Sequence, residues 1–298
     1  MNTKKILFAI ILLSFPAISL RAQNDTIWRT GGISALNFNQ VSFHNWAAGG
    51  DNSLSGNALL SLFAKYKKGK WAWDNTGDFA IGGTKLDKQK IRKSDDKIDI
   101  NSKIGYDIGK KFYLSYILGF KTQFTEGFIY TDSSRTRISN FLAPAYILNA
   151  IGIDWKPNDD LSIFLSPATA KTTIVNDDAL SLAGQYGVDP GEKSKTELGA
   201  YFNMQYKHNI MENVAFSTKL ELFSSYSHNP QNVDVNWEVV IALKVNKFLN
   251  ALIQTQLLYD DDIMVPKTEA NALPGPGTQF KESFGLGLAY NFNGYKVK

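Results

Sequence analysis

Cysteine is absent from the 298 residues of this chain, and histidine occurs only three times. The absence of cysteine excludes disulfides, thiolate nucleophiles and every zinc site that uses cysteine ligands. Three histidines also leave little scope for a histidine-rich metal centre. We therefore predict that the protein carries neither a metal nor any other cofactor.

Long apolar runs are also missing, apart from one at the start of the chain. The run 6–20 follows Lys4 and Lys5 and is followed by Arg21 and Ala22. A short basic region, a short apolar core and a small residue are typical of a Sec-type signal peptide. The run is too short for a membrane-spanning helix, which needs about 20 apolar residues. We predict a cleaved signal peptide at 1–22 and a mature protein at 23–298.

A net charge of either sign is nearly absent once that segment is removed. The full chain has 32 basic and 28 acidic residues, and Lys4, Lys5 and Arg21 are the basic residues of the segment. Subtracting these three leaves 29 basic against 28 acidic side chains, a net charge of +1. There is no basic patch and no glycine-rich phosphate loop of the required spacing. We therefore expect no nucleic-acid partner.

What the mature chain does have is a regular alternation of apolar and polar residues. The clearest case is 283–292, where Phe284, Leu286 and Leu288 alternate with serine and glycine. A period of two is the pattern of a β-strand, because successive side chains point to opposite faces. The same pattern recurs along the chain and predicts about 12 strands. Their expected ranges are 29–40, 52–67, 70–85, 97–109, 112–126, 139–156, 160–174, 195–208, 213–227, 233–246, 249–261 and 279–293.

The connections between these strands alternate in length. Short turns at one end and long polar loops at the other are typical of a bacterial outer-membrane barrel, with the short turns in the periplasm. An even strand count brings both termini to the periplasmic end. The short turns fall at 68–69, 109–111, 157–160, 209–213 and 246–247, and the long loops at 87–96, 127–137, 176–195 and 262–279.

Aromatic residues gather near both ends of the predicted strands. Two aromatic belts around an aliphatic band match a lipid-facing barrel better than a soluble β-sandwich, whose apolar face points inward. We therefore predict a single antiparallel transmembrane β-barrel in contact with outer-membrane lipid. The belt at the short turns comprises Trp71, Trp73, Tyr106, Phe112, Trp155, Tyr206, Tyr290 and Phe292; the belt at the long loops comprises Phe124, Phe128, Tyr130, Phe141, Tyr226, Trp237 and Tyr259.

One stretch of sequence resembles a known family. Residues 43–54 read FHNWAAGGDNSL, residues 28–32 read WRTGG, and the chain has the strand 284–292 near its end. These segments are similar to an outer-membrane β-barrel family of unknown function found in Bacteroidota, which opens with a motif of the NWAAGG type. The resemblance extends over essentially the whole mature chain. It implies an outer-membrane location, but it brings no activity and no functional residue.

The polar face of the predicted strands points into the barrel and carries charges of both signs. The predicted lumen residues are Lys65, Asp74, Asp78, Asp99, Lys103, Lys121, Lys219, Glu221, Glu238 and Lys244. If the turn at 109–111 is tight, Asp99 faces Lys121 on the next strand, where opposite charges attract. A barrel of 12 strands lies between those filled by side chains and those with an open channel. The lumen is thus either a narrow polar pathway or a closed interior filled by ion pairs.

The loop after the first strand is a second candidate site. Asn45, Trp46, Gly49, Gly50 and Asp51 place a large aromatic beside two glycines that permit a tight bend. Trp46 either constricts the lumen, contacts a partner, or rests on the rim as a hydrophobic cap. Loop carboxylates are the ligands that Ca²⁺ prefers, so a loop Ca²⁺ site is a further alternative; the candidates are Asp51, Asp87, Asp95, Asp96, Asp177 and Asp178.

An enzyme that acts on lipids is the third alternative for the function. Such a site needs a serine activated by a base, and His228 lies next to Ser227 and close to Ser224 and Ser225. Neighbouring side chains on a strand point to opposite faces, so Ser227 and His228 do not pair directly. We therefore predict that the protein is not an enzyme. The first prediction is a narrow, porin-like pore for small polar solutes or ions, and its rival is a closed accessory subunit that contacts other outer-membrane proteins.

Overall fold

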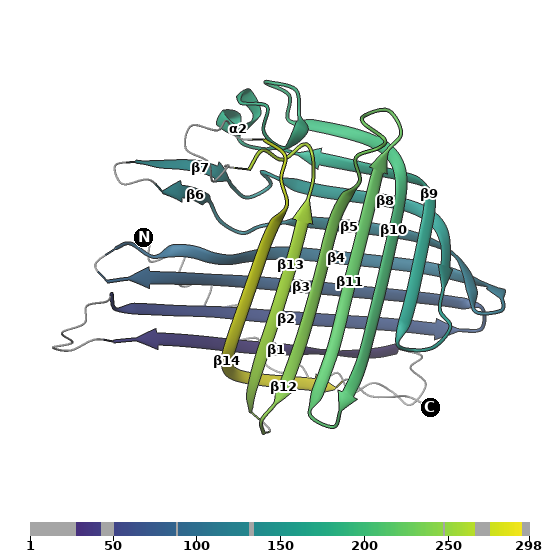
Figure 1. The fold of residues 1–298 in the computed structure, drawn as a ribbon. Coiled ribbons are helices and arrows are strands. Elements are labelled where there is room, and N and C mark those ends of the chain that lie inside the picture. Colours follow the sequence, from purple (N-terminus) through teal and green to yellow (C-terminus); the bar gives the residue numbers. More distant parts are fainter. Residues whose placement is uncertain are drawn as a thin grey trace.

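The computed structural model describes residues 28–42, 51–87, 89–130, 134–246, 248–265 and 275–293. Within these ranges twelve strands form one closed antiparallel barrel, as predicted (Figure 1). The barrel strands are β1 (Trp28–Val41), β2 (Ser53–Lys68), β3 (Trp71–Leu86), β4 (Arg92–Gly109), β5 (Phe112–Thr122), β8 (Ala145–Trp155), β9 (Leu161–Ile174), β10 (Ser194–Met211), β11 (Val214–Ser225), β12 (Asp234–Lys244), β13 (Leu249–Tyr259) and β14 (Gln279–Asn293).

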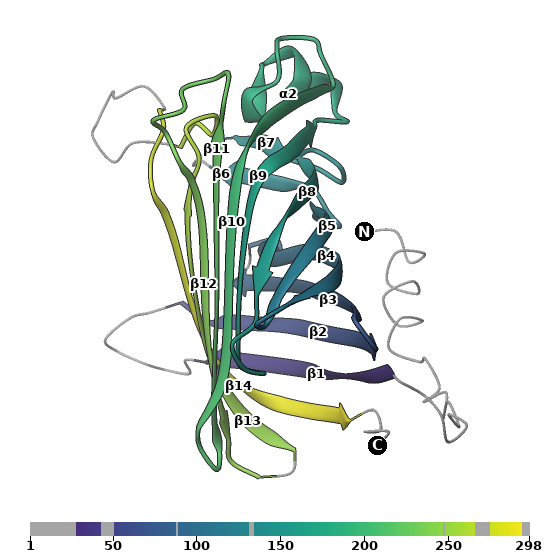
Figure 2. The ribbon, with the colours of Figure 1, turned by 90° about the vertical axis from the view of Figure 1, so that its right-hand side faces the viewer.

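Each barrel strand pairs with its neighbour in the chain, and β14 closes the ring on β1. The one place where the order skips elements is between β5 and β8, because β6 (Gly127–Tyr130) and β7 (Arg135–Ser139) form a separate hairpin. Strands β10–β13 run steeply across β1–β3 on the opposite wall (Figures 1 and 2). Strongly tilted strands are what closure of a sheet into a barrel requires.

Two of the long loops contain regular structure that the sequence did not predict. The hairpin of β6 and β7 lies in the predicted loop 127–137. The loop 176–195 contains α2 (Asp178–Leu182) and the short 3₁₀ turn η1 (Gln185–Gly187). The N-cap of the helix is Asp177, whose side chain accepts hydrogen bonds from the backbone N–H groups of Ala179 and Leu180. In the described residues, no helix is long and apolar enough to cross a membrane.

The outer surface of the barrel is aliphatic in the middle of the strands. Leu114, Ile151 and Leu165 alternate with inward residues, yet 51%, 55% and 57% of their surfaces are exposed. An exposed apolar band of this kind has no stabilising role in water and indicates a surface that another apolar phase covers. The alternation predicted from the sequence thus separates this apolar outer face from the face that lines the lumen.

Aromatic side chains surround the barrel at the end that carries the short turns. The rings of Trp71 and Tyr106 are 5.1 Å apart, and those of Phe112 and Trp155 are 6.2 Å apart. Both barrel ends of the chain lie here, because Gly31 near the start of β1 pairs with Asn293 at the end of β14. This is the arrangement that the sequence predicted for the first aromatic belt.

The second predicted belt needs a correction. Phe128 and Tyr130 belong to the β6–β7 hairpin rather than to a barrel strand. There Arg135 lies over the ring of Phe128 at 4.6 Å, and Arg92 lies over the ring of Tyr130 at 4.4 Å. A cation above an aromatic face is attracted by the ring quadrupole. These two rings therefore hold the hairpin in place, and Trp237 on β12 remains an outward aromatic of the barrel.

Candidate functional site

The predicted lumen residues lie on the inward face of the strands. The registers place Lys65, Asp74 and Lys103 side by side on β2, β3 and β4. A second row at another level contains Asp78, Asp99 and Lys121. On the opposite wall, Lys219 of β11 is the register partner of Glu238 on β12, with Glu221 two residues further along β11. Lys244, at the end of β12 next to the short turn, is exposed.

The predicted register of Asp99 opposite Lys121 is confirmed, but their main ion pairs are formed elsewhere. Asp99 accepts a hydrogen bond from Lys219 at 3.2 Å, and Lys121 pairs with Glu221. Both pairs join β4 or β5 to β11, which is not adjacent to either strand. A lysine side chain is long enough to reach across the lumen. It can therefore pair with a carboxylate on a distant strand as well as with one on the adjacent strand.

One ion pair crosses the lumen between directly opposite strands. Lys97 on β4 donates to both carboxylate oxygens of Glu238 on β12, at 2.8 and 2.9 Å. Five strands separate β4 from β12 in either direction around the ring. Two side chains can meet in this way only where the opposite walls approach each other. The barrel is therefore flattened at this level, and the ion pair divides the lumen into two halves.

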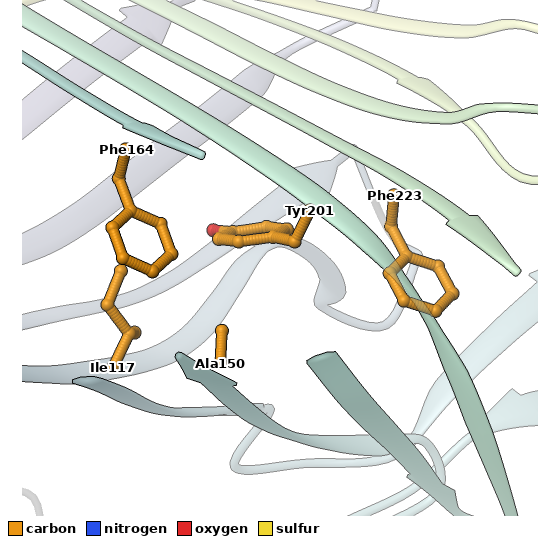
Figure 3. Close-up of a cluster of buried hydrophobic side chains, with 5 residues drawn as sticks. All are labelled: Ile117, Ala150, Phe164, Tyr201 and Phe223. Carbon is orange, nitrogen blue, oxygen red and sulfur yellow. The ribbon is translucent and has the colours of Figure 1, made fainter. Parts of the chain in front are cut away.

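The half on the side of β5 and β8–β11 is packed with side chains. Its inward residues include Phe164, Ala150, Tyr201, Ile117 and Phe223, all at most 6% exposed, which form one apolar cluster (Figure 3). The Tyr201 hydroxyl donates to Glu221 at 2.7 Å and so links the cluster to the cross-lumen ion pairs. We refer to this region as the packed half.

Charged side chains seal the packed half toward the short turns. Asp154 is fully buried and lies 2.7 Å from Lys103 and 3.5 Å from Lys156. Ser162 donates to the same carboxylate at 2.7 Å. A buried carboxylate is tolerated when cations and hydrogen bonds surround it. The packed half is thus closed by groups that satisfy one another.

The other half of the lumen, on the side of β13, β14, β1, β2 and β3, is different. Inward residues there are mostly small or uncharged, and most of them are partly accessible to water. The amide of Asn37 donates to Asn57 at 2.8 Å, and Ser61 donates to Asp78. We refer to this region as the open half; its inward residues include Ala35, Asn57, Leu59, Ser61, Gln254 and Ser283.

Further ion pairs lie near the long loops. Lys171 on β9 pairs with Asp234 at 2.6 Å and with Asp260 at 3.3 Å. Lys281 on β14 pairs with Asp95 on β4 at 2.7 Å and thereby spans β1, β2 and β3. Among these residues the sequence pointed only to Asp95, and to that residue as a loop Ca²⁺ ligand rather than as the partner of a lumen lysine. Lys97 points inward like Asp99, two residues further along β4. Its partner Glu238 is 141 residues away in the sequence, so the pattern of a single strand does not reveal the pair.

The predicted loop motif lies almost wholly outside the described residues. This applies to Asn45, Trp46, Gly49 and Gly50, while Asp51 is described and exposed. The predicted signal peptide at 1–22 also lies outside these residues. A constriction by Trp46 therefore stays a prediction.

Four of the six loop carboxylates considered for Ca²⁺ have side-chain partners in the described residues, and of these Asp95 and Asp178 pair with Lys281 and Lys193. Asp96 accepts hydrogen bonds from the backbone N–H groups of Phe124 and Thr125 at 2.7 and 2.9 Å. Asp177 caps α2 and lies 3.0 Å from Arg137. These carboxylates therefore order the loops. Two pockets lie among the same loops: one of about 710 Å³ between the β6–β7 hairpin and α2, and one of about 430 Å³ beside His228.

The serines near His228 do not form a catalytic pair in the described part of the chain. Ser224 donates to the backbone carbonyl of Pro230 at 2.8 Å. The nearest carboxylate partner of His228 is Asp262, at 4.0 Å from its Nε2. A serine nucleophile requires a base within hydrogen-bond reach. This cluster thus offers no activated serine, and the prediction that the protein is not an enzyme remains untested.

We expect Asp177→Ala to loosen the loop that contains α2. Loss of an N-cap costs about 1 kcal/mol, which is a factor of about five in the local opening equilibrium. Hydrogen exchange at Ala179 and Leu180 measures this opening. The matched control is Asp178→Ala, because Asp178 is 83% exposed and contacts only Lys193 among the ion pairs of the structure. Equal exchange rates in the two variants would contradict the capping role.

The cap of α2 should also persist in mild acid. Burial raises the pKa of Asp177, but hydrogen bonds from Asn140 and the Leu180 N–H, with the charge of Arg137, outweigh burial and hold the pKa below its ordinary value. A carboxyl group with a lowered pKa in the folded state stabilises that state above its ordinary pKa. The stabilisation is lost as the pH falls through the lowered value.

One family model matches part of the chain. Residues 38–128 match the model of a family described as Protein of unknown function (DUF3078). This segment includes part of the barrel and the predicted opening motif, whose assignment to Bacteroidota barrels stays a prediction. The comparison with curated proteins gives no match.

Several solved structures are similar at low sequence identity. An outer membrane channel from Pseudomonas putida F1 is 10% identical, with 93% of this chain and 99% of that chain covered and a TM-score of 0.39. The translocator domain of the autotransporter NalP from Neisseria meningitidis is 10% identical, with coverage of 96% and 95% and a TM-score of 0.36. The Pseudomonas putida toluene transporter TodX is 11% identical, with coverage of 92% and 91% and a TM-score of 0.32. With TM-scores this low, none of the three assigns an activity to this chain.

Proposed function

We propose that this protein is an outer-membrane barrel that provides a narrow pathway for small polar solutes through the open half of its lumen. The observation that carries the proposal is the asymmetry of the interior. The packed half is filled by Phe164, Tyr201 and their neighbours. The open half is lined mostly by uncharged side chains that water reaches. A solute that crosses the barrel therefore follows β13, β14, β1, β2 and β3.

The membrane location rests on the outer surface. The exposed aliphatic band has the composition that a bilayer core covers, and the aromatic belt at the short turns matches an interface with water. All short turns and both strand termini lie at the same end, which corresponds to the periplasmic side in barrels of this type. Export would use the signal peptide predicted at 1–22.

The cross-lumen ion pairs set the character of this pathway. Lys97–Glu238 and Lys219–Asp99 combine opposite charges, so they narrow the lumen without giving it a single sign. A selectivity filter for anions or cations uses rings of one sign. We therefore expect a small conductance with weak ion selectivity.

The decisive measurement is conductance of the refolded mature protein in a planar bilayer, with a variant that fills the open half. Ala35 points inward on β1, so Ala35→Trp should remove most of the conductance by placing an indole in the pathway. Ala58 on β2 points outward, so Ala58→Trp is the matched control and should conduct as the wild type does. Equal currents in both variants would rule out the open half as the pathway.

A second candidate is a closed barrel that serves as an accessory subunit of an outer-membrane assembly. The ion pair between Lys97 and Glu238 favours this candidate, because a contact between opposite walls holds the walls close together and narrows the lumen. A correctly folded barrel that stays silent in the bilayer, and that co-purifies stably with other envelope proteins, would support this candidate over the pore.

A further inference from the structure

The seam between β1 and β14 ends part-way along both strands. In the described residues its register runs from Gly31 with Asn293 to Asn37 with Gly287. Described residues of both strands continue beyond Asn37 and Gly287 toward the long loops, but no register pair joins them there. By contrast, β1 and β2 remain paired as far as Val41 with Ser53.

Strand β14 pairs with different neighbours along its two parts. From Gln279 to Leu286 it pairs with β13 alone among the described residues, and it joins β1 only from Gly287 onward. On the other side of the seam, β1 from Phe38 to Val41 pairs with β2 alone in the described part of the chain. The two strands therefore separate toward the long loops, as the bend of β14 in Figures 1 and 2 shows.

The point of separation is marked by Asn37. This residue is 8% exposed and donates to Asn57. A Cβ atom on Gly285 would lie 2.9 Å from its side chain, so the two strands still touch at that level. Beyond this contact the backbone edges of β1 and β14 face each other without a ladder. Unpaired backbone groups are costly in hydrocarbon, so this part of the seam needs water or polar groups beside it.

The two sides of the separated seam have different chemistry. The outer side carries three of the most exposed aromatic residues of the protein, Phe38, Phe280 and Phe284, at 65%, 64% and 67%. The inner side belongs to the open half and presents Lys281 and Ser283 from β14. Lys281 remains 47% exposed in its side chain while it contacts Asp95. The opening thus has apolar groups on its outer side and hydrogen-bonding groups on its inner side. This combination matches an amphiphile, which has an apolar chain and a polar head.

We propose that the separated part of the β1–β14 seam is a lateral opening through which single-chain amphiphiles pass between the outer leaflet and the open half. The polar head lies against Asn57, Ser283 and Lys281, and the acyl chain lies between Phe38 and Phe284. This inference rests on the proposed pathway through the open half and specifies its substrate class.

The absence of cysteine makes the seam testable by a reversible crosslink. Continuing the β1–β14 register by five pairs would place Ser42 beside Glu282, both pointing outward and neither in contact with the proposed ligand. The double variant Ser42→Cys with Glu282→Cys should therefore close the seam when oxidised and release it when reduced. The control is Leu36→Cys with Ala58→Cys, which crosslinks the intact β1–β2 seam, where these residues are register partners.

The experiment records ion current through single barrels while lauroyl lysophosphatidylcholine is added to the bilayer. With the seam variant reduced, we expect the amphiphile to produce transient blocks of the current. Oxidation should abolish the blocks and leave the open current unchanged, whereas the oxidised control should still show them. Blocks that persist in the oxidised seam variant, or current that the amphiphile never blocks, would overturn the lateral opening and leave the pathway intact. An absence of current in every form would instead count against the proposed pore.

A second measurement decides the matter if the crosslink does not form or the barrel is silent. A fluorophore on Ser283→Cys reports on the inner side of the seam, and one on Thr76→Cys reports on the open half away from it. Lysophosphatidylcholine with a nitroxide on its acyl chain should quench the label at 283 several-fold more than the label at 76. Equal quenching at both positions, or none at either, would contradict entry through the seam.

Discussion

Replacing Ile100 by arginine is expected to destabilise the folded barrel by about 2–4 kcal/mol, the cost of a cation at the bilayer midplane. Ile100 lies in the middle of β4, points outward and is 42% exposed on the isolated chain. If the aliphatic band faces lipid, the guanidinium has no water or carboxylate within the hydrocarbon. Urea titration of folding into lipid vesicles, followed by the heat-dependent shift in gel migration, measures the change.

The matched control introduces the same side chain on the other face. Gln254 lies in the middle of β13, points into the open half and is partly accessible. Gln254→Arg should change the unfolding free energy by far less, because water reaches the new charge. If both variants were as stable as the wild type, the barrel would not be embedded in lipid, and the proposed location would be wrong.

Most of the fold was predictable because each strand separates two different environments. Where one face is apolar and the other lines the lumen, alternation identifies the strand directly, and β14 was predicted at 279–293 as observed. The alternation of apolar and polar residues is weaker where a strand extends beyond the aliphatic band. Strand β4 begins at Arg92 rather than at 97, because Lys93 is held by hydrogen bonds to Asp96 and Gln123. Contacts of that kind join separate loops and leave no periodic pattern.

The candidate site was predictable only in part, for two physical reasons. The first is the reach of lysine, which lets Lys97 and Lys121 select partners across the lumen instead of on the next strand. The second is a bulge in β9 at Pro167, where the register shifts on both sides of the strand. The extra residue reverses the alternation along the strand. Before the bulge the even-numbered residues, such as Ser166, point inward, and after it the odd-numbered residues, such as Lys171, point inward. A proline inside a strand often marks a bulge and was the available signal.

A second large effect is expected at Lys171, inside the lumen near the long loops. We expect Lys171→Met to destabilise the barrel by about 3–5 kcal/mol, as when one partner of a buried ion pair is removed. Its side chain is 13% exposed, and it is the one cation paired with both Asp234 and Asp260 in the described part of the chain. The ammonium also lies 5.2 Å from the ring of Phe223 in the packed half. The same vesicle-folding titration measures the loss.

Two further variants separate the lost ion pair from a general effect of the substitution. Lys193→Met removes a lysine from an exposed pair with Asp178, whose side chains are 55% and 83% exposed, so it should cost less than about 1 kcal/mol. Adding Asp260→Asn to Lys171→Met should recover part of the stability, because one of the two uncompensated carboxylates is then neutral. A double variant that is no more stable than Lys171→Met would show that Asp260 does not depend on this lysine. In that case the charges near the long loops would act independently rather than as one cluster that holds β9, β12 and β13 together.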